Sequence, residues 1–137
     1  MGAPGFGALI LDSGALIAIE RGEQRMRELV NRAVAQGVRL YVPATAVAEV
    51  WRGGGGRQAR LAKFLGSGQR SSHLHIVPLD FDTAKLIGLL LARAGAGAIG
   101  GADAMVAWCA LHFGGRIITS DPGEIQRLVA PERVQRL

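Results

Sequence analysis

Short runs rich in aliphatic residues alternate with longer amphipathic segments along the chain. The short runs predict buried strands at 8–11, 38–42, 73–77, 116–119 and 133–135. The longer segments have helical spacing and predict helices at 13–20, 23–36, 44–52, 57–65, 81–93, 101–113 and 122–129. Strands that alternate with crossover helices pair in parallel. We therefore expect one domain over 1–137, a three-layer α/β/α sandwich around a mostly parallel sheet of four to five strands.

Glycine and proline mark the boundaries of these elements. Gly37 follows the second predicted helix, and Pro43 ends the second predicted strand. Four consecutive glycines at 53–56 interrupt the chain before a basic helix. A glycine-rich connection at 95–100 matches the dinucleotide-binding fingerprint as a string, but it follows a helix and not a strand. A cofactor loop is therefore not expected there.

Four carboxylates lie in or beside strongly apolar sequence: Asp12, Glu49, Asp103 and Asp121. Burial of an ionised carboxylate is unfavourable unless a partner neutralises it, and a hard divalent cation can neutralise several oxygen ligands together. Asp12 and Asp121 end predicted strands, while Glu49 and Asp103 lie on helices that reach the same edge of the sheet. Because ligands gather at the carboxyl ends of parallel strands, the sequence predicts a metal site at this edge.

Each of these acids also has an ordinary structural interpretation. Asp12 could cap the helix that follows it, and Asp103 lies where the dipole of a helix favours negative charge. Asp121 and Glu124 are spaced as a capping box with proline at the first helical position. Glu49 lies well inside an apolar segment, although it could be an exposed position on an amphipathic helix.

The chain carries an excess of basic residues, which bears on the kind of partner it binds. The net charge is +5, the pI is near 10.6, and arginines far outnumber lysines among the sixteen basic residues. Guanidinium groups bind phosphate oxygens in pairs, so this balance suits a partner that carries phosphate, although a basic surface can also serve solubility alone. The candidates for contact with a phosphate backbone flank or follow the four glycines: Arg52, Arg57, Arg60 and Lys63. The alternative interpretation is that these four residues only form the solvated face of a helix.

The remaining composition sets outer limits. At 137 residues with 49% hydrophobic residues, the chain can bury a core without disulfides. The single cysteine, Cys109, lies in a helical apolar pattern and is expected to be a small buried residue in a reducing compartment. The first six residues lack the basic and apolar regions of an export signal, and no apolar run is long enough to span a bilayer. We expect a cytoplasmic location.

The order of these motifs resembles that of the PIN-domain nucleases, and within them that of the VapC-type toxins of bacterial toxin–antitoxin pairs. The resemblance rests on the apolar frames of Asp12-Ser13, Ala48-Glu49-Val50, Ala102-Asp103-Ala104 and Thr119-Ser120-Asp121. It covers almost the whole chain and implies a ribonuclease that depends on Mg²⁺ or Mn²⁺. One departure is that Pro122-Gly123-Glu124-Ile125 follows the last motif, where many relatives have a further aspartate and a phenylalanine.

The resemblance also implies roles for individual residues. Asp12 and Asp103 would be the principal metal ligands, and Glu49 would be a ligand or would orient the metal-bound water. Asp121 would complete a second, weaker metal site. Ser13 and Thr119 match the small hydroxyl residues that orient such carboxylates.

Partners follow from the same resemblance. They are an RNA substrate, a cognate antitoxin and a second copy of the chain in a homodimer. The apolar surface of the second predicted helix could serve either protein contact, or it could be ordinary core: Leu29, Val30 and Val34. Two alternatives of other classes stay open: a noncatalytic module that binds RNA or a partner, and a metal-dependent phosphatase.

Overall fold

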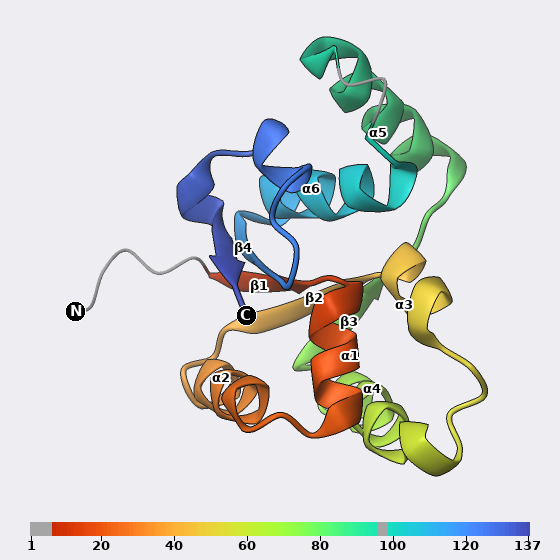
Figure 1. Cartoon of the computed structure of the whole chain (residues 1–137), viewed down its shortest axis with the longest axis vertical. Helices are drawn as coiled ribbons and strands as arrows, with labels where there is room; N and C mark the ends of the chain where they lie inside the picture. The colour runs from red at the N-terminus through yellow and green to blue at the C-terminus, as the bar shows by residue number, and fades with distance from the viewer. Residues whose placement is uncertain (1–6, 96–98) are drawn as a thin grey trace.

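The computed structural model describes residues 7–95 and 99–137 (Figure 1). The expectation about an export signal at residues 1–6 and three positions of the connection 95–100 lie outside the described residues. The five strands form one sheet in the order β3-β2-β1-β4-β5, and each neighbouring pair is parallel. They are β1 (Ala8–Leu11), β2 (Arg39–Pro43), β3 (Leu74–Val77), β4 (Gly115–Thr119) and β5 (Val134–Arg136). The predicted parallel sheet is confirmed.

Helices cover both faces of the sheet, as Figure 1 shows. One face carries α1 (Ser13–Arg21), α2 (Gln24–Ala35) and α4 (Ala59–Arg70), and the other carries α5 (Phe81–Ala94) and α6 (Gly101–Phe113). The short α3 (Ala44–Val50) follows β2 and packs against both α1 and α6. The three-layer α/β/α sandwich predicted from the sequence is therefore the observed fold.

Alternation along the central strands divides the core into two clusters. In β1, Ile10 packs toward α6 while Leu11 packs toward α1, and Ile117 and Ile118 of β4 divide in the same way. All four side chains are fully buried. Burial of a large aliphatic side chain contributes about 1.5–3 kcal/mol, so the two clusters fix β1 and β4 firmly side by side.

Some boundaries differ from the predicted ones. The helix predicted at 44–52 ends at Val50, and the helix predicted at 57–65 is a 3₁₀ turn (Gly56–Gln58) followed by α4. Among the helices of the described ranges, none has the length and apolar character needed to cross a bilayer.

The predicted helix at 122–129 is wrong. The chain forms turns and one 3₁₀ turn there, Ile125–Arg127. The carboxylate of Asp121 accepts a hydrogen bond from the N–H of Gly123 (3.3 Å), which makes a local turn where the capping box was predicted. Gly123 also favours a turn over a helix. A second 3₁₀ turn, Pro131–Arg133, leads into β5.

Candidate functional site

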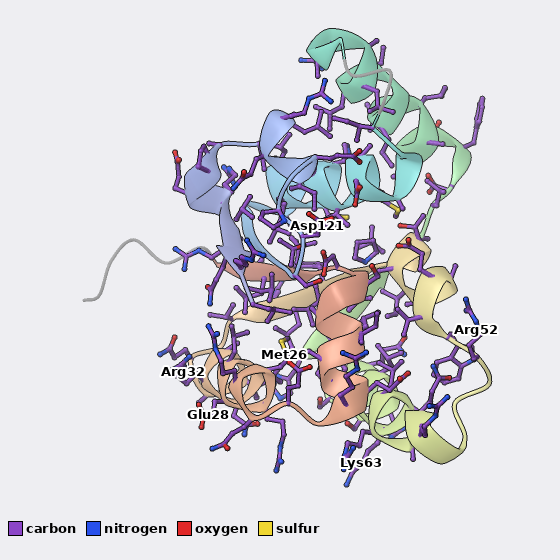
Figure 2. All side chains as sticks on the ribbon, in the orientation of Figure 1. Met26, Glu28, Arg32, Arg52, Lys63 and Asp121 are labelled. Atoms are coloured by element: carbon purple, nitrogen blue, oxygen red, sulfur yellow. The ribbon has the colours of Figure 1, made fainter. Side chains whose placement is uncertain are left out.

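The carboxyl edge of the sheet gathers the predicted acids. The chain leaves β1 for β2 on one side, whereas β4 lies on the other side of β1, so a crevice of the doubly wound type opens outside β1 and β4. Asp12 directly follows β1, and Asp121 lies two residues beyond β4. Asp103 lies in the first turn of α6, which runs back toward the start of β4. Figure 2 shows Asp121 between α6 and the N-terminal end of α1.

Asp12 is a buried carboxylate with a local hydrogen-bond frame. It is the N-cap of α1, its side chain is 8% exposed, and its Oδ1 accepts a hydrogen bond from the N–H of Ala15 (2.9 Å). Burial raises the pKa of Asp12, and the negative charge of Glu49 raises it further. Hydrogen bonds from the Thr119 hydroxyl and the N–H groups of Ala15 and Gly14 act in the opposite direction. The capping interpretation is confirmed, and the site interpretation is compatible with it.

Asp103 shows that several acids share one electrostatic environment. Its pKa is raised from 3.8 to about 6, first by burial and then by a hydrogen bond with the side chain of Glu124. The negative charges of Glu124, Glu49 and Asp12 raise it further, in that order. Like charges that converge in this way favour the neutral form of a carboxyl group. The structure therefore brings Glu124, Glu49 and Asp12 close enough to Asp103 for their negative charges to raise its pKa.

Glu124, which is exposed like Asp121, is the acid of this loop that acts on Asp103. Asp121 is exposed and turns toward its own loop, where its N–H donates a hydrogen bond to Oγ1 of Thr119 (3.0 Å). Ile125, next to Glu124, is buried in the cluster beneath α6 and anchors the turn there. The position of Glu124 therefore depends on how Ile125 packs beneath α6, which the sequence alone does not show.

The two hydroxyl residues differ in the frame they provide. The buried Thr119 links Asp12 to the loop after β4, because its hydroxyl bonds to the carboxylate of Asp12 and accepts the N–H of Asp121. Ser13 is half-buried in the first turn of α1. Thr119 thus joins the segment of Asp12 to the segment of Asp121. The role predicted for Ser13 is supported only by its position next to Asp12.

Close packing of two backbone segments requires glycine at position 14. A Cβ atom built on Gly14 would overlap Oγ of Ser120. Gly14 lies in the first turn of α1, and Ser120 follows β4, so this contact joins the segments that carry Asp12 and Asp121. The first turn of α1 can therefore approach the segment after β4 this closely only because Gly14 has no side chain.

The donor set fits a hard divalent cation in its chemistry. Within residues 7–95 and 99–137, no three His, Cys, Asp or Glu side chains stand together as a preassembled metal site. In the same ranges, none of the salt bridges between described residues involves the acids of this edge; the ion pair of Lys85 with Asp82 (3.6 Å) lies on α5. Burial is the main cause of the raised pKa of Asp12 and of Asp103, and neighbouring negative charge adds to it; a bound cation would counter both effects. Oxygen ligands of this kind suit Mg²⁺ or Mn²⁺.

The four predicted RNA contacts divide into two pairs. Arg52 and Arg57 line a hollow of about 400 Å³ that also contains Glu49. Arg60 and Lys63 line a larger hollow of about 670 Å³ between α2 and α4. Figure 2 shows Arg52 beside α3 and Lys63 at the far side of α4. The pair beside Glu49 therefore belongs to the acidic edge, and the other pair does not.

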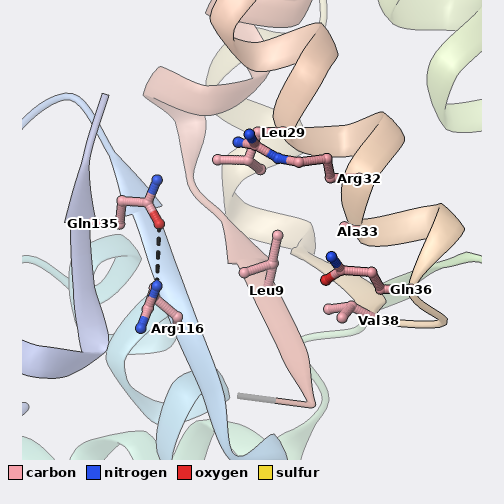
Figure 3. Close-up of a pocket in the computed structure, with 8 residues that line it drawn as sticks. All are labelled: Leu9, Leu29, Arg32, Ala33, Gln36, Val38, Arg116 and Gln135. Atoms are coloured by element: carbon pink, nitrogen blue, oxygen red, sulfur yellow. Dashed lines mark hydrogen bonds between the residues drawn. The ribbon is translucent and has the colours of Figure 1, made fainter. Parts of the chain in front are cut away.

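A further hollow lies on the α2 face of the sheet, away from the acids (Figure 3). Arg116 donates a hydrogen bond to Gln135 at its rim (3.4 Å). Its volume is about 210 Å³ and its lining contains no carboxylate: Leu9, Leu29, Arg32, Ala33, Gln36, Val38, Arg116 and Gln135. It therefore lacks the anionic oxygen ligands that the acidic edge offers to a divalent cation.

Comparison with known proteins places this site in a family. The PIN domain profile matches residues 9–130, and no curated protein gives a significant match. Similar solved structures include VapBC2 from Rickettsia felis bound to a promoter DNA fragment, with a TM-score of 0.66, 17% identity, and coverage of 95% of this chain and 98% of that chain. DNA-bound VapBC from Salmonella typhimurium has a TM-score of 0.65 and 22% identity, with 94% and 97% covered. FitAcB from Neisseria gonorrhoeae has a TM-score of 0.57 and 19% identity, with 88% and 92% covered. These similarities show the fold, and the profile match over most of the chain shows that it belongs to the PIN domain family.

Proposed function

We propose that this protein is a metal-dependent endoribonuclease and the toxin component of a toxin–antitoxin pair. The observation that carries the proposal is the gathering of acids at the carboxyl edge of the sheet, where Asp12 directly follows β1 and Asp103 lies in the first turn of α6. The negative charges of Glu124, Glu49 and Asp12 all act on Asp103 there, in addition to its burial. PIN domains are generally nucleases. The similar structures are complexes named VapBC and FitAcB, which supports a protein partner. We place this activity in the cytoplasm.

The residues of the edge have separate tasks in this proposal. Asp12 and Asp103 would hold Mg²⁺ or Mn²⁺, Glu49 would orient the attacking water, and Glu124 would complete the ligand set more directly than Asp121. When bound, the metal would lower the pKa of water and stabilise negative charge on phosphoryl oxygens. Above a pH of about 6, Asp103 is mostly ionised and able to serve as a ligand.

Cleavage of RNA in the presence and absence of divalent cations tests the proposal. Wild-type protein should cleave single-stranded RNA with Mg²⁺ or Mn²⁺, and EDTA should abolish cleavage. Asp12→Asn and Asp103→Asn should reduce the rate by at least about a hundredfold, because each removes a ligand charge while preserving shape. Asp82→Asn, which removes an exposed carboxylate on α5, should leave the rate unchanged. Cleavage that survives EDTA and both site variants would refute the proposal, as would faster hydrolysis of a phosphomonoester than of RNA.

The hollow between α2 and α4 is the surface we propose for the antitoxin. Its floor includes Ile19, Val30 and Phe64, and its rim carries Arg27, Arg60 and Lys63. An amphipathic segment with an apolar face and acidic flanks fits this combination. Of the predicted contact residues, Leu29, Val30 and Val34 are all half-buried against the core, and Val30 reaches this hollow. Copurification of a coexpressed acidic protein, lost in a Lys63→Glu variant, would support the assignment.

Helix α5 is the surface we propose for a homodimer. Of the fourteen residues of α5, only Ile87 is buried. Phe81 is 76% exposed, and Leu89 is 56% exposed. Lys85 and Asp82 lie on the same helix, so an antiparallel pair of α5 helices could place opposite charges across a two-fold axis. Sedimentation velocity should give a dimer at micromolar concentration. A monomer under these conditions would refute this part of the proposal.

A further inference from the structure

A hollow beside Glu49 has the features of a site for RNA backbone phosphate. It lies between α1, the end of α3 and the four glycines at 53–56, which we call the glycine loop. Its lining includes three arginines, Arg21, Arg52 and Arg57, and its volume of about 400 Å³ suits a phosphate group with part of its sugar. The hollow adjoins the acidic edge through Glu49.

One guanidinium in this hollow is fixed in place. Nη1 of Arg52 donates hydrogen bonds to the backbone oxygens of Ala48 (3.3 Å) and Trp51 (2.7 Å). These oxygens belong to the end of α3, where a cation is favoured by the helix dipole. Arg52 is thereby held beside the helical turn that carries Glu49.

Gln58 holds the glycine loop in its shape. Its Oε1 accepts the N–H groups of Arg52 (2.8 Å) and Gly54 (3.1 Å), and its Nε2 donates to Oε1 of Glu20 (2.8 Å) and to the oxygen of Val50 (2.8 Å). A single side chain therefore joins the end of α1, the end of α3 and the loop.

The burial of Gln58 separates it from an ordinary surface glutamine. Its side chain is 8% exposed, and in the described part of the chain the other buried polar residues are Asp12 and Thr119, both at the acidic edge. A buried amide is unfavourable unless its groups are hydrogen-bonded, and here both ends of the amide are bonded twice. The cost of burying this amide is thus offset by a defined loop conformation.

The glycine loop is closely packed at one position, Gly54. Gly54 has a φ of 75°, in the left-handed region, and a Cβ atom there would lie 2.5 Å from the ring of Trp51. The Trp51 ring therefore covers the loop backbone at the point where Gln58 bonds to it. Loop shape and arginine position are set together.

We propose that this hollow binds a backbone phosphate of the RNA strand that is being cleaved, close to the phosphate at which cleavage occurs. Gln58 is the positioning residue that presents Arg52 and Arg57 to this neighbouring phosphate. The inference rests on the proposed ribonuclease function. Helix α1 leads from Asp12 to Glu20 over about 12 Å, at about 1.5 Å per residue. The hollow along this helix is thus reached by a neighbouring phosphate of a strand whose cleaved phosphate lies near Asp12.

The first test measures binding of a fluorescently labelled single-stranded RNA by anisotropy, in EDTA so that no cleavage occurs. Arg52→Gln and Arg57→Gln should each weaken binding roughly tenfold. Each should also reduce the slope of log K against log salt concentration by about 0.7, the change expected for one lost phosphate contact on a single strand. Arg25→Gln removes the same charge from the exposed start of α2 and should change affinity by less than about twofold.

The second test separates positioning from charge. Gln58→Ala leaves the net charge unchanged, yet it should weaken binding and reduce the salt slope because the loop arginines lose their fixed place. If Gln58→Ala is too unstable to purify, Gln58→Glu and its combination with Glu20→Gln decide the matter. Gln58→Glu alone sets two carboxylates against each other. The double variant restores the bond between the two side chains, but not the bond to the oxygen of Val50, and should therefore recover a part of the lost affinity that Gln58→Glu alone does not.

The outcomes distinguish this inference from the proposed function. Wild-type protein that binds and cleaves RNA while the Arg52, Arg57 and Gln58 variants keep full affinity and salt slope would overturn the inference and leave the nuclease intact. A Gln58→Ala variant with lower melting temperature but unchanged affinity and slope would overturn the positioning role. Wild-type protein that neither binds nor cleaves RNA would refute the proposed function itself.

Discussion

Replacement of Asp103 by asparagine should stabilise the metal-free protein at neutral pH. Burial, the hydrogen bond with Glu124 and the neighbouring charges raise the pKa of Asp103 from 3.8 to about 6. The folded state therefore holds this proton more tightly than the unfolded state does, and the stability linked to it is fully present below pH 3.8 and lost as the pH rises through about 6. Asparagine imitates the protonated side chain at every pH.

The magnitude follows from the same pKa values. One pKa unit corresponds to about 1.4 kcal/mol, so the change in the pKa of Asp103 from 3.8 to about 6 sets an upper limit of about 3 kcal/mol. Asp103 is half-exposed, and solvent screening reduces this figure. We expect Asp103→Asn to raise the free energy of unfolding by about 1–2 kcal/mol at pH 7, with the difference vanishing near pH 4.

Urea unfolding at several pH values between 4 and 8, in EDTA, measures this difference. Asp121→Asn is the matched control, because it removes an exposed carboxylate from the same edge while keeping an oxygen that can accept the N–H of Gly123. Addition of Mn²⁺ at pH 7.5 should reverse the order, since the cation binds and stabilises the wild-type carboxylates more strongly. Equal stability of wild type and Asp103→Asn at pH 7 would refute the electrostatic reasoning.

Three further outcomes follow from the structure. Thr119→Val should lower the free energy of unfolding by about 1–3 kcal/mol in urea because it leaves the carboxylate of Asp12 and a loop N–H without their hydroxyl partner, while Thr119→Ser should stay close to wild type. Gly14→Ala should cost about 1–3 kcal/mol through the overlap with Ser120, and a Ser120→Ala change in the same chain should recover part of that loss. Leu89→Glu should shift the sedimentation coefficient from dimer to monomer without changing the circular dichroism spectrum, because the side chain is exposed on α5.

Local pattern was enough to predict the layers of the fold. The aliphatic runs of β1 and β4 have residues buried on both faces, as a central parallel strand requires, and Cys109 is fully buried as expected. The helix predicted at 122–129 failed because side-chain hydrogen bonds of Asp121 and Thr119 compete with helical ones over this short segment. Such competition depends on where β4 ends, which sequence spacing does not settle.

The site was predictable in part, for a similar reason. Asp12 directly follows β1, and Glu49 and Asp103 lie on helices whose direction the topology fixes, so their convergence could be inferred from strand order. Glu124 could not, because its approach to Asp103 depends on how Ile125 packs beneath α6. Gln58 was missed because its neighbours in sequence are glycine, arginine and alanine, and nothing in that pattern indicates burial.

The division of the basic residues has a consequence for specificity. RNA and an acidic protein segment are both anionic, so a uniformly basic surface would bind either with little discrimination. Here Arg57 lies in the hollow with Glu49, whereas Lys63 lies across α4 in the hollow with apolar side chains. Arg57→Glu should therefore impair RNA binding and leave the copurifying partner bound, and Lys63→Glu should do the reverse. Parallel loss of both activities in each variant, measured by RNA anisotropy and by copurification, would show that one surface serves both ligands.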